Sequence, residues 1–172
     1  FAGLNPPARE RPTMCWDPVR QRVVMFGGSD NFAFLNDTWE WDGSFWNQRT
    51  PANAPSPRYG CSMTFDPYRG RIVLFGGLGS GGLLADTWEW DGSNWSQRVT
   101  SQAPPARAFH GGYFDTVLQR VMVFGGDDFS GSRNDWWGLG YWTNAWGGFA
   151  ANTMPSPRSQ FGCWFDASRQ RP

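Results

Sequence analysis

The stretch FGGSDNFAFLNDTWEWDGSFW at residues 26–46 returns as a close copy, FGGLGSGGLLADTWEWDGSNW, at residues 75–95. The second copy starts 49 residues after the first, and a looser third copy follows from Phe124. A period of about 20 to 50 residues is typical of repeat proteins, in which each unit buries its apolar faces against its neighbours. The sequence therefore predicts an array of repeats.

An arginine opens every copy and sets the repeat boundaries. Three copies are complete and the fourth is shorter. We treat residues 1–172 as one segment, with repeats at about 9–57, 58–106 and 107–157 and a partial repeat at 158–172.

Each repeat predicts four short antiparallel strands. In the copy that opens at Arg58, residues 60–65 form a first strand, which ends at a turn rich in Pro and Gly. The apolar run Ile72–Phe75 lacks polar alternation, so this strand must be covered on both faces. Residues 86–91 form a third strand whose two tryptophans share one face, and an Asp-Gly turn leads to a fourth strand at Trp95. Sheets that are apolar on both faces must stack around an axis, as propeller blades do.

These motifs resemble the kelch repeat. That pattern has a double glycine after the second strand, an aromatic residue in the third and a tryptophan in the fourth, and the likeness runs from Arg9 to Asp166. It implies an all-β, kelch-type β-propeller segment of three four-stranded blades plus the first strand of a fourth. The matching residues are Gly27, Gly28, Gly76, Gly77, Gly125 and Gly126, with Trp46, Trp95 and Trp146.

The third repeat departs from its siblings. It reads DWWGLGYWTNAW at residues 135–146, without the acidic residues that follow the first Asp in its siblings and without the Asp-Gly turn, so its hairpin geometry is left open. Because a closed propeller needs more blades than three, we expect either a piece of a larger propeller or copies that associate to complete a ring. An uncovered blade face would expose a large apolar surface.

Composition argues against several classes of function. The 15 basic residues are all arginines, balanced by 15 acidic residues, so no basic tract predicts nucleic-acid binding. No apolar run is long enough to span a bilayer. The three cysteines lie at different repeat positions, which favours buried, inert thiols over a metal site. We expect no cofactor.

The sequence offers little for catalysis. The copper site of propellers that resemble galactose oxidase needs two histidines and two tyrosines, and this chain has one histidine. The carboxylates Asp37, Asp86 and Asp135 recur in every repeat, whereas a catalytic pair would not. We therefore predict that the protein is not an enzyme.

Candidate partner-binding residues fall into two groups. The opening arginines lie beside the innermost strand, where guanidinium groups suit carboxylates, or alternatively they hold neighbouring blades together. The other candidates differ between repeats, as the loop at residues 31–34 also does. For His110 the alternative is a packed histidine, and for Asp127 and Asp128 it is a solvated loop in place of a calcium site. For Tyr141 and Trp142 the alternative is a cap on the third blade. The full set is Arg9, Arg58, Arg107, Arg158, His110, Asp127, Asp128, Tyr141 and Trp142.

The function that these features favour is a non-catalytic interaction scaffold that binds a protein or peptide at one rim. A structural subunit of an extracellular or surface assembly is the first alternative, and carbohydrate binding by Tyr141 and Trp142 is a weaker one. The WEWDG style of repeat resembles kelch arrays of bacterial secreted or surface proteins. That likeness implies an extracellular or cell-surface location.

Overall fold

The computed structural model describes residues 5–140, 143–149, 156, 158 and 159. These residues form three four-stranded antiparallel sheets, which confirms the predicted blades. Blade 1 contains β1 (Thr13–Asp17), β2 (Arg22–Ser29), β3 (Phe34–Trp41) and β4 (Trp46–Arg49). Blade 2 contains β5 (Ser62–Asp66), β6 (Arg71–Phe75), β9 (Thr87–Trp90) and β10 (Trp95–Arg98). Blade 3 contains β11 (Gly111–Asp115), β12 (Arg120–Phe124), β15 (Trp136–Leu139) and β16 (Trp146–Phe149).

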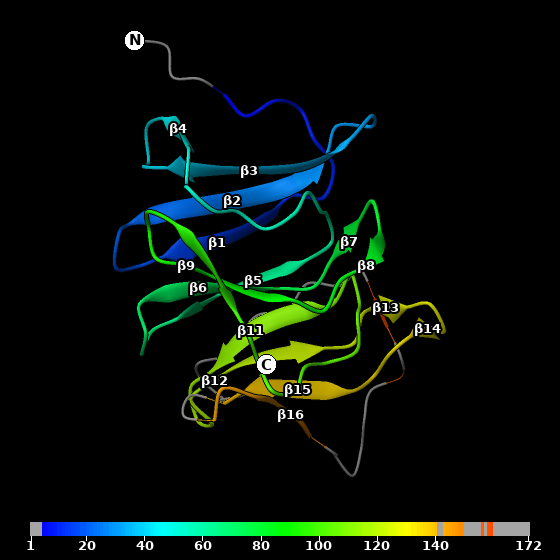
Figure 1. Ribbon diagram of the computed structural model, residues 1–172. Helices are drawn as coiled ribbons and strands as arrows, with labels where there is room; N and C mark the ends of the chain where they lie inside the picture. The colour runs from blue at the N-terminus through cyan, green and yellow to red at the C-terminus, as the bar shows by residue number, and fades with distance from the viewer. Residues whose placement is uncertain (1–4, 141–142, 150–155, 157, 160–172) are drawn as a thin grey trace.

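The three blades stack face to face in chain order (Figure 1). The first strand of blade 2, β5, contacts both β1 and β11, so the first strands line one edge of the stack. We call the end of the sheets where these first strands begin the rim. Two small hairpins extend the loops on this side: β7 (Leu78–Gly79) with β8 (Gly82–Leu83), and β13 (Asp127–Asp128) with β14 (Gly131–Ser132). The predicted first strand of a fourth blade lies outside the described residues.

The central apolar strand of blade 2 serves two interfaces. Ile72 and Leu74 pack toward blade 1 in one core cluster, whereas Val73 and Phe75 pack toward blade 3 in another. All four side chains are at most 1% exposed. Burial of each contributes roughly 1.5–3 kcal/mol, which explains why this run carries no polar alternation.

Strand boundaries differ from the sequence prediction where the backbone is irregular. The first strand of blade 2 starts at Ser62 and not at residue 60, because Gly60 adopts a left-handed conformation with φ of 66°. In blade 1, β3 starts at Phe34 and not at residue 37, the counterpart of residue 86, because a register shift between Phe26 and Gly28 extends its pairing with β2. In blade 3 the hairpin forms without an Asp-Gly turn, with Leu139 opposite Trp146.

Candidate functional site

The opening arginine of the second repeat joins two blades. The Arg58 backbone bonds to blade 1, since its N–H donates to the Leu35 carbonyl and its carbonyl accepts from Gly28 N–H, both at 3.0 Å. Its guanidinium group turns into blade 2 and binds both oxygens of Asp86 at 2.5 and 2.8 Å. It also donates to the Gly76 carbonyl at 3.1 Å.

The other repeats use the same arrangement. Arg107 binds both oxygens of Asp135 at 2.6 and 2.8 Å, and Arg9 binds Asp37 at 2.5 and 2.8 Å. The backbone of Arg107 pairs with the loop of blade 2, and the backbone of Arg158 pairs in the same way with blade 3. Within the described residues, the Arg158 guanidinium hydrogen-bonds only to Ser156.

The acidic partners are held ionised. Burial acts to raise the pKa of Asp86, but the hydrogen bonds and charge of Arg58, with the indole N–H of Trp88, outweigh it and lower the pKa. Arg58 is fully buried, and its five N–H donors contact Asp86, Gly76 and Ser56. This geometry supports the alternative that the opening arginines hold neighbouring blades together. Partner binding by them stays a prediction without geometric support.

His110 lies at the rim, buried behind the surface. Its Nε2 is 2.9 Å from the Ser62 hydroxyl in a hydrogen bond, and its Nδ1 has no partner among the described residues. Burial lowers its pKa to about 3, helped by the charge of Arg107, so the ring is neutral at physiological pH. Burial also raises the pKa of the neighbouring Cys61 thiol to about 12.

Asp127 and Asp128, the acidic pair of the third repeat, bind other residues of their own loop. Asp127 accepts a hydrogen bond from the Ser132 hydroxyl, and Asp128 pairs with Arg133. No group of three or more His, Cys, Asp or Glu side chains in the described part of the chain could hold a metal ion. Tyr141 and Trp142 lie outside the described residues.

A second set of rim residues comes together where the sequence singled out only His110. Arg11, Gly60 and Phe109 occupy the same repeat position, two residues after the opening arginine, and all three have positive φ, at 50°, 66° and 60°. A left-handed backbone is unstrained for glycine but costs energy with a side chain. Two of the three repeats therefore keep a large side chain there despite strain.

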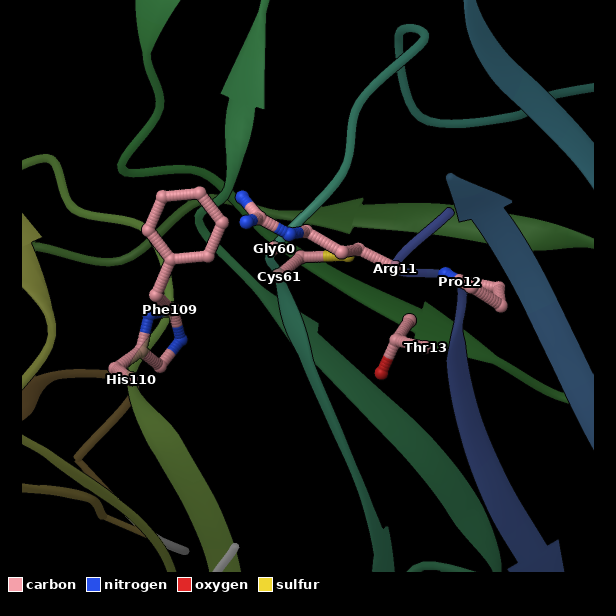
Figure 2. Close-up of a pocket in the computed structure, with 7 residues that line it drawn as sticks. All are labelled: Arg11, Pro12, Thr13, Gly60, Cys61, Phe109 and His110. Atoms are coloured by element: carbon pink, nitrogen blue, oxygen red, sulfur yellow. The ribbon is translucent and has the colours of Figure 1, made fainter. Parts of the chain in front are cut away.

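These side chains form an open pocket (Figure 2). The guanidinium carbon of Arg11 lies 4.9 Å from the ring centre of Phe109 and 5.8 Å from that of Tyr59. Phe109 covers Gly60, where an added Cβ would lie 2.6 Å from the ring. The pocket encloses about 310 Å³, and Cys61 and His110 also line it. We call Arg11, Tyr59, Gly60, Phe109 and His110 the rim site.

Aromatic residues continue from the rim site across the loops of blade 1. The Phe34 ring lies 5.1 Å from that of Tyr59, and a hollow of about 400 Å³ beside it is lined by Phe32, Pro57 and Ser80. Phe32 is 97% exposed, so the loop at residues 31–34 presents an aromatic side chain to solvent.

Sequence reasoning missed Arg11, Tyr59 and Phe109. The available signal was the glycine at residue 60, because a glycine in one repeat marks a backbone conformation that its siblings must also adopt. The large side chains of Arg11 and Phe109 at this position then needed a separate explanation.

Stacked four-stranded blades, joined by buried arginine–aspartate pairs, define a β-propeller repeat protein. Residues 1–169 match the family model described as the KLHDC2/KLHL20/DRC7 Kelch-repeats domain. The chain therefore belongs to the kelch-repeat family, whose repeats generally mediate protein–protein interaction. No curated protein matches it at a significant level. The described residues contain no helix long and apolar enough to cross a membrane.

Proposed function

We propose that this chain is a non-catalytic interaction module that binds an acidic, partly apolar segment of a partner protein at the rim site. The observation that carries the proposal is Arg11. Its side chain is exposed, it stacks on Phe109 and Tyr59, and it makes no hydrogen bond or ion pair through its guanidinium group among the described residues. An oriented guanidinium with free donors binds carboxylates in bidentate fashion.

The stacking of Arg11 prepares it for such a contact. Aromatic faces attract the cation and restrict its motion, so less conformational entropy is lost when a ligand binds. Arginine and tyrosine are also enriched among residues that dominate binding energy. The strain at Arg11 and Phe109 fits this role, since strained backbone collects at binding sites.

The pocket floor favours binding over chemistry. His110 is neutral and Cys61 is protonated at neutral pH, because burial shifts both pKa values away from the charged form. A protonated thiol is a poor nucleophile. The floor therefore accepts an apolar or hydrogen-bonding group beside the carboxylate that Arg11 binds.

The experiment is a screen of random decapeptides displayed on phage against the folded chain, followed by affinity measurements on the enriched peptides. We expect enrichment of peptides that carry Asp or Glu next to an apolar residue. Arg11→Ala should weaken these peptides at least about tenfold, because a central arginine contact is lost.

Arg22→Ala is the matched control. Arg22 opens β2 at the end of the sheet opposite the rim, so its loss should leave affinity unchanged. Equal affinity of the enriched peptides for the Arg11→Ala variant and the unmodified chain would overturn the proposal. Arg58→Ala is unsuitable because it removes a buried blade contact, and lost binding would then report on folding.

A further inference from the structure

A hollow of about 400 Å³ lies beside the rim site, between loops of blades 1 and 2. The loop of blade 1 contributes Asn31, Phe32 and Phe34. The opposite wall consists of Pro57, which precedes blade 2, and Ser80, at the tip of the β7–β8 hairpin. We call this space the loop hollow. Both of its walls belong to the described residues, so no further blade is needed to form it.

Hydrogen bonds close the turn that presents Phe32. The Asp30 carboxylate accepts from the N–H of Ala33 at 2.8 Å and from that of Phe32 at 3.1 Å. The Asp30 N–H in turn donates to the Ala33 carbonyl at 3.2 Å. The bonds from Ala33 and Phe32 lower the pKa of Asp30, so the carboxylate is ionised at neutral pH and keeps its role as an acceptor. The backbone beneath Phe32 is therefore ordered before a ligand arrives, which reduces the entropy lost on binding.

The ring of Phe32 is not part of the repeat scaffold. The residue 49 positions further along, at the same place in the second repeat, is Gly81, which has no side chain. The Phe32 side chain is 97% exposed, so it contributes almost nothing to the core. Folding therefore does not account for an aromatic ring at this position, whereas a contact with a partner does.

The loop hollow and the rim site are connected by Tyr59. The Phe34 ring lies 5.1 Å from the Tyr59 ring, and the Arg11 guanidinium carbon lies 5.8 Å from the centre of the same ring. These two distances place the Phe34 ring within about 11 Å of the Arg11 guanidinium. An extended chain rises roughly 3.3 Å per residue, so about two to four residues of a bound segment cover this distance.

The lining of the loop hollow suits an apolar side chain. Aromatic rings and a proline form most of its surface, and none of the described residues that line it is charged. An apolar side chain can therefore enter without removing a charge from water. The side chains of Asn31 and Ser80 make no hydrogen bond among the described residues, so they are available to the backbone of a bound segment.

We infer that the loop hollow is a second subsite for the partner segment. It binds an aromatic or branched aliphatic side chain that lies about two to four residues from the carboxylate on Arg11, with the segment extended across Tyr59. This inference rests on the proposed function, because the carboxylate at the rim site fixes where the segment begins. It adds a second requirement, since the partner must carry an apolar anchor at this spacing in addition to the apolar residue beside its acidic group.

The test uses the peptides that the phage screen enriches. Phe32→Ala should weaken them at least about fivefold, because an aromatic side chain that contacts the anchor is lost. The exposure of Phe32 means that this variant should fold like the unmodified chain, which near-ultraviolet circular dichroism can check.

Phe45→Ala is the matched control. Phe45 is 50% exposed and lies in the turn after β3, at the end of the sheets opposite the rim. Its turn is closed in the same manner, since the Asp42 carboxylate accepts from the N–H of Phe45 at 2.8 Å and of Ser44 at 2.9 Å. We expect this variant to bind the peptides with unchanged affinity.

A second measurement asks whether Phe32 contacts the anchor. The apolar anchor of one enriched peptide is replaced by alanine, and the affinity of both peptides is measured for the unmodified chain and for Phe32→Ala. Two groups in contact give losses that do not add. We expect the peptide change to weaken binding at least about fivefold on the unmodified chain and less than about twofold on Phe32→Ala. Equal losses on the two chains would overturn the inference.

The remaining outcomes separate this inference from the proposed function. Peptides that depend on Arg11 but bind Phe32→Ala as tightly as the unmodified chain would overturn the second subsite and leave the proposed function intact. Enriched peptides that lack an apolar residue at the expected spacing would do the same. Peptides that lose affinity on Phe32→Ala but not on Arg11→Ala would overturn both, because the segment would then not lie on the rim site. A screen without enriched peptides would also contradict both.

Discussion

The indole nitrogen of Trp95 in blade 2 donates a hydrogen bond of 2.9 Å to the hydroxyl of Thr38 in blade 1. Both side chains are at most 1% exposed. The equivalent pair, Trp146 with Thr87, joins blades 2 and 3 at 3.0 Å. The fourth-strand tryptophan of one repeat thus depends on the third-strand threonine of the repeat before it, so the motif that recurs along the sequence describes an interface between repeats.

This dependence predicts the effect of Thr38→Val. Valine keeps the shape of threonine but leaves the Trp95 N–H buried without an acceptor, which costs about 1–3 kcal/mol. Urea denaturation should show this loss for Thr38→Val. Thr50→Val, in the exposed linker after β4, should change stability by less than about 0.5 kcal/mol. Equal midpoints for the two variants would mean that the bond does not couple the blades.

Breaking the Arg58–Asp86 pair should destabilise the fold more than Thr38→Val does. Asp86→Asn leaves the fully buried Arg58 without its countercharge, and loss of one partner of a buried pair costs about 3–5 kcal/mol. The control is Arg71→Gln, which breaks an exposed 3.6 Å pair with Asp91 and should cost less than about 1 kcal/mol. Comparable losses in the two variants would show that Asp86 is not part of a buried blade joint.

The sequence could predict the blades because their determinants are local or periodic. The run at Ile72–Phe75 without polar residues indicated a strand with two covered faces, and the structure confirms it. The alternative role of the opening arginines, to hold neighbouring blades together, could also be inferred from their regular recurrence alone. The partner of each arginine lies 28 residues further along the chain, a separation that no local pattern specifies.

The rim site could not be predicted in the same way. Arg11, Tyr59 and Phe109 belong to three different repeats, and their contact depends on how the blades are rotated about the propeller axis. Strand periodicity contains no information about that rotation. The only sequence hint was Gly60, whose left-handed conformation its counterparts share.

Gly77 provides a prediction on backbone geometry. Its φ is 105°, and an added Cβ would lie 3.0 Å from both the Tyr59 carbonyl oxygen and the Cys61 Cβ. Gly77→Ala should therefore cost at least about 1–3 kcal/mol from backbone strain, in addition to the steric contact. Gly81→Ala, at a loop tip with no atom within 4 Å, is the matched control. Thermal unfolding distinguishes them, and an unchanged midpoint for Gly77→Ala would contradict this account.

The free energy of unfolding should depend on pH through a single residue, His110. It is the one histidine of the chain, and burial lowers its pKa from 6.5 to about 3 in the folded state. Between these values the unfolded chain binds a proton that the folded chain does not, so stability is full above pH 6.5 and falls as the pH falls toward 3. The slope approaches about 1.4 kcal/mol per pH unit, or roughly 2 kcal/mol between about pH 7 and 5.

Asp37, Asp86 and Asp135 stay ionised between pH 7 and 5 in the folded protein, because the pKa of each is lowered below its ordinary value of 3.8. Urea denaturation at about pH 7 and 5 should therefore show the loss in the unmodified chain. His110→Gln, which can still hydrogen-bond to Ser62 but does not titrate, should remove most of it. A variant that keeps the full pH dependence would show that another group binds the proton, and His110 would then be charged and solvated in the folded protein, contrary to its buried place behind the rim site.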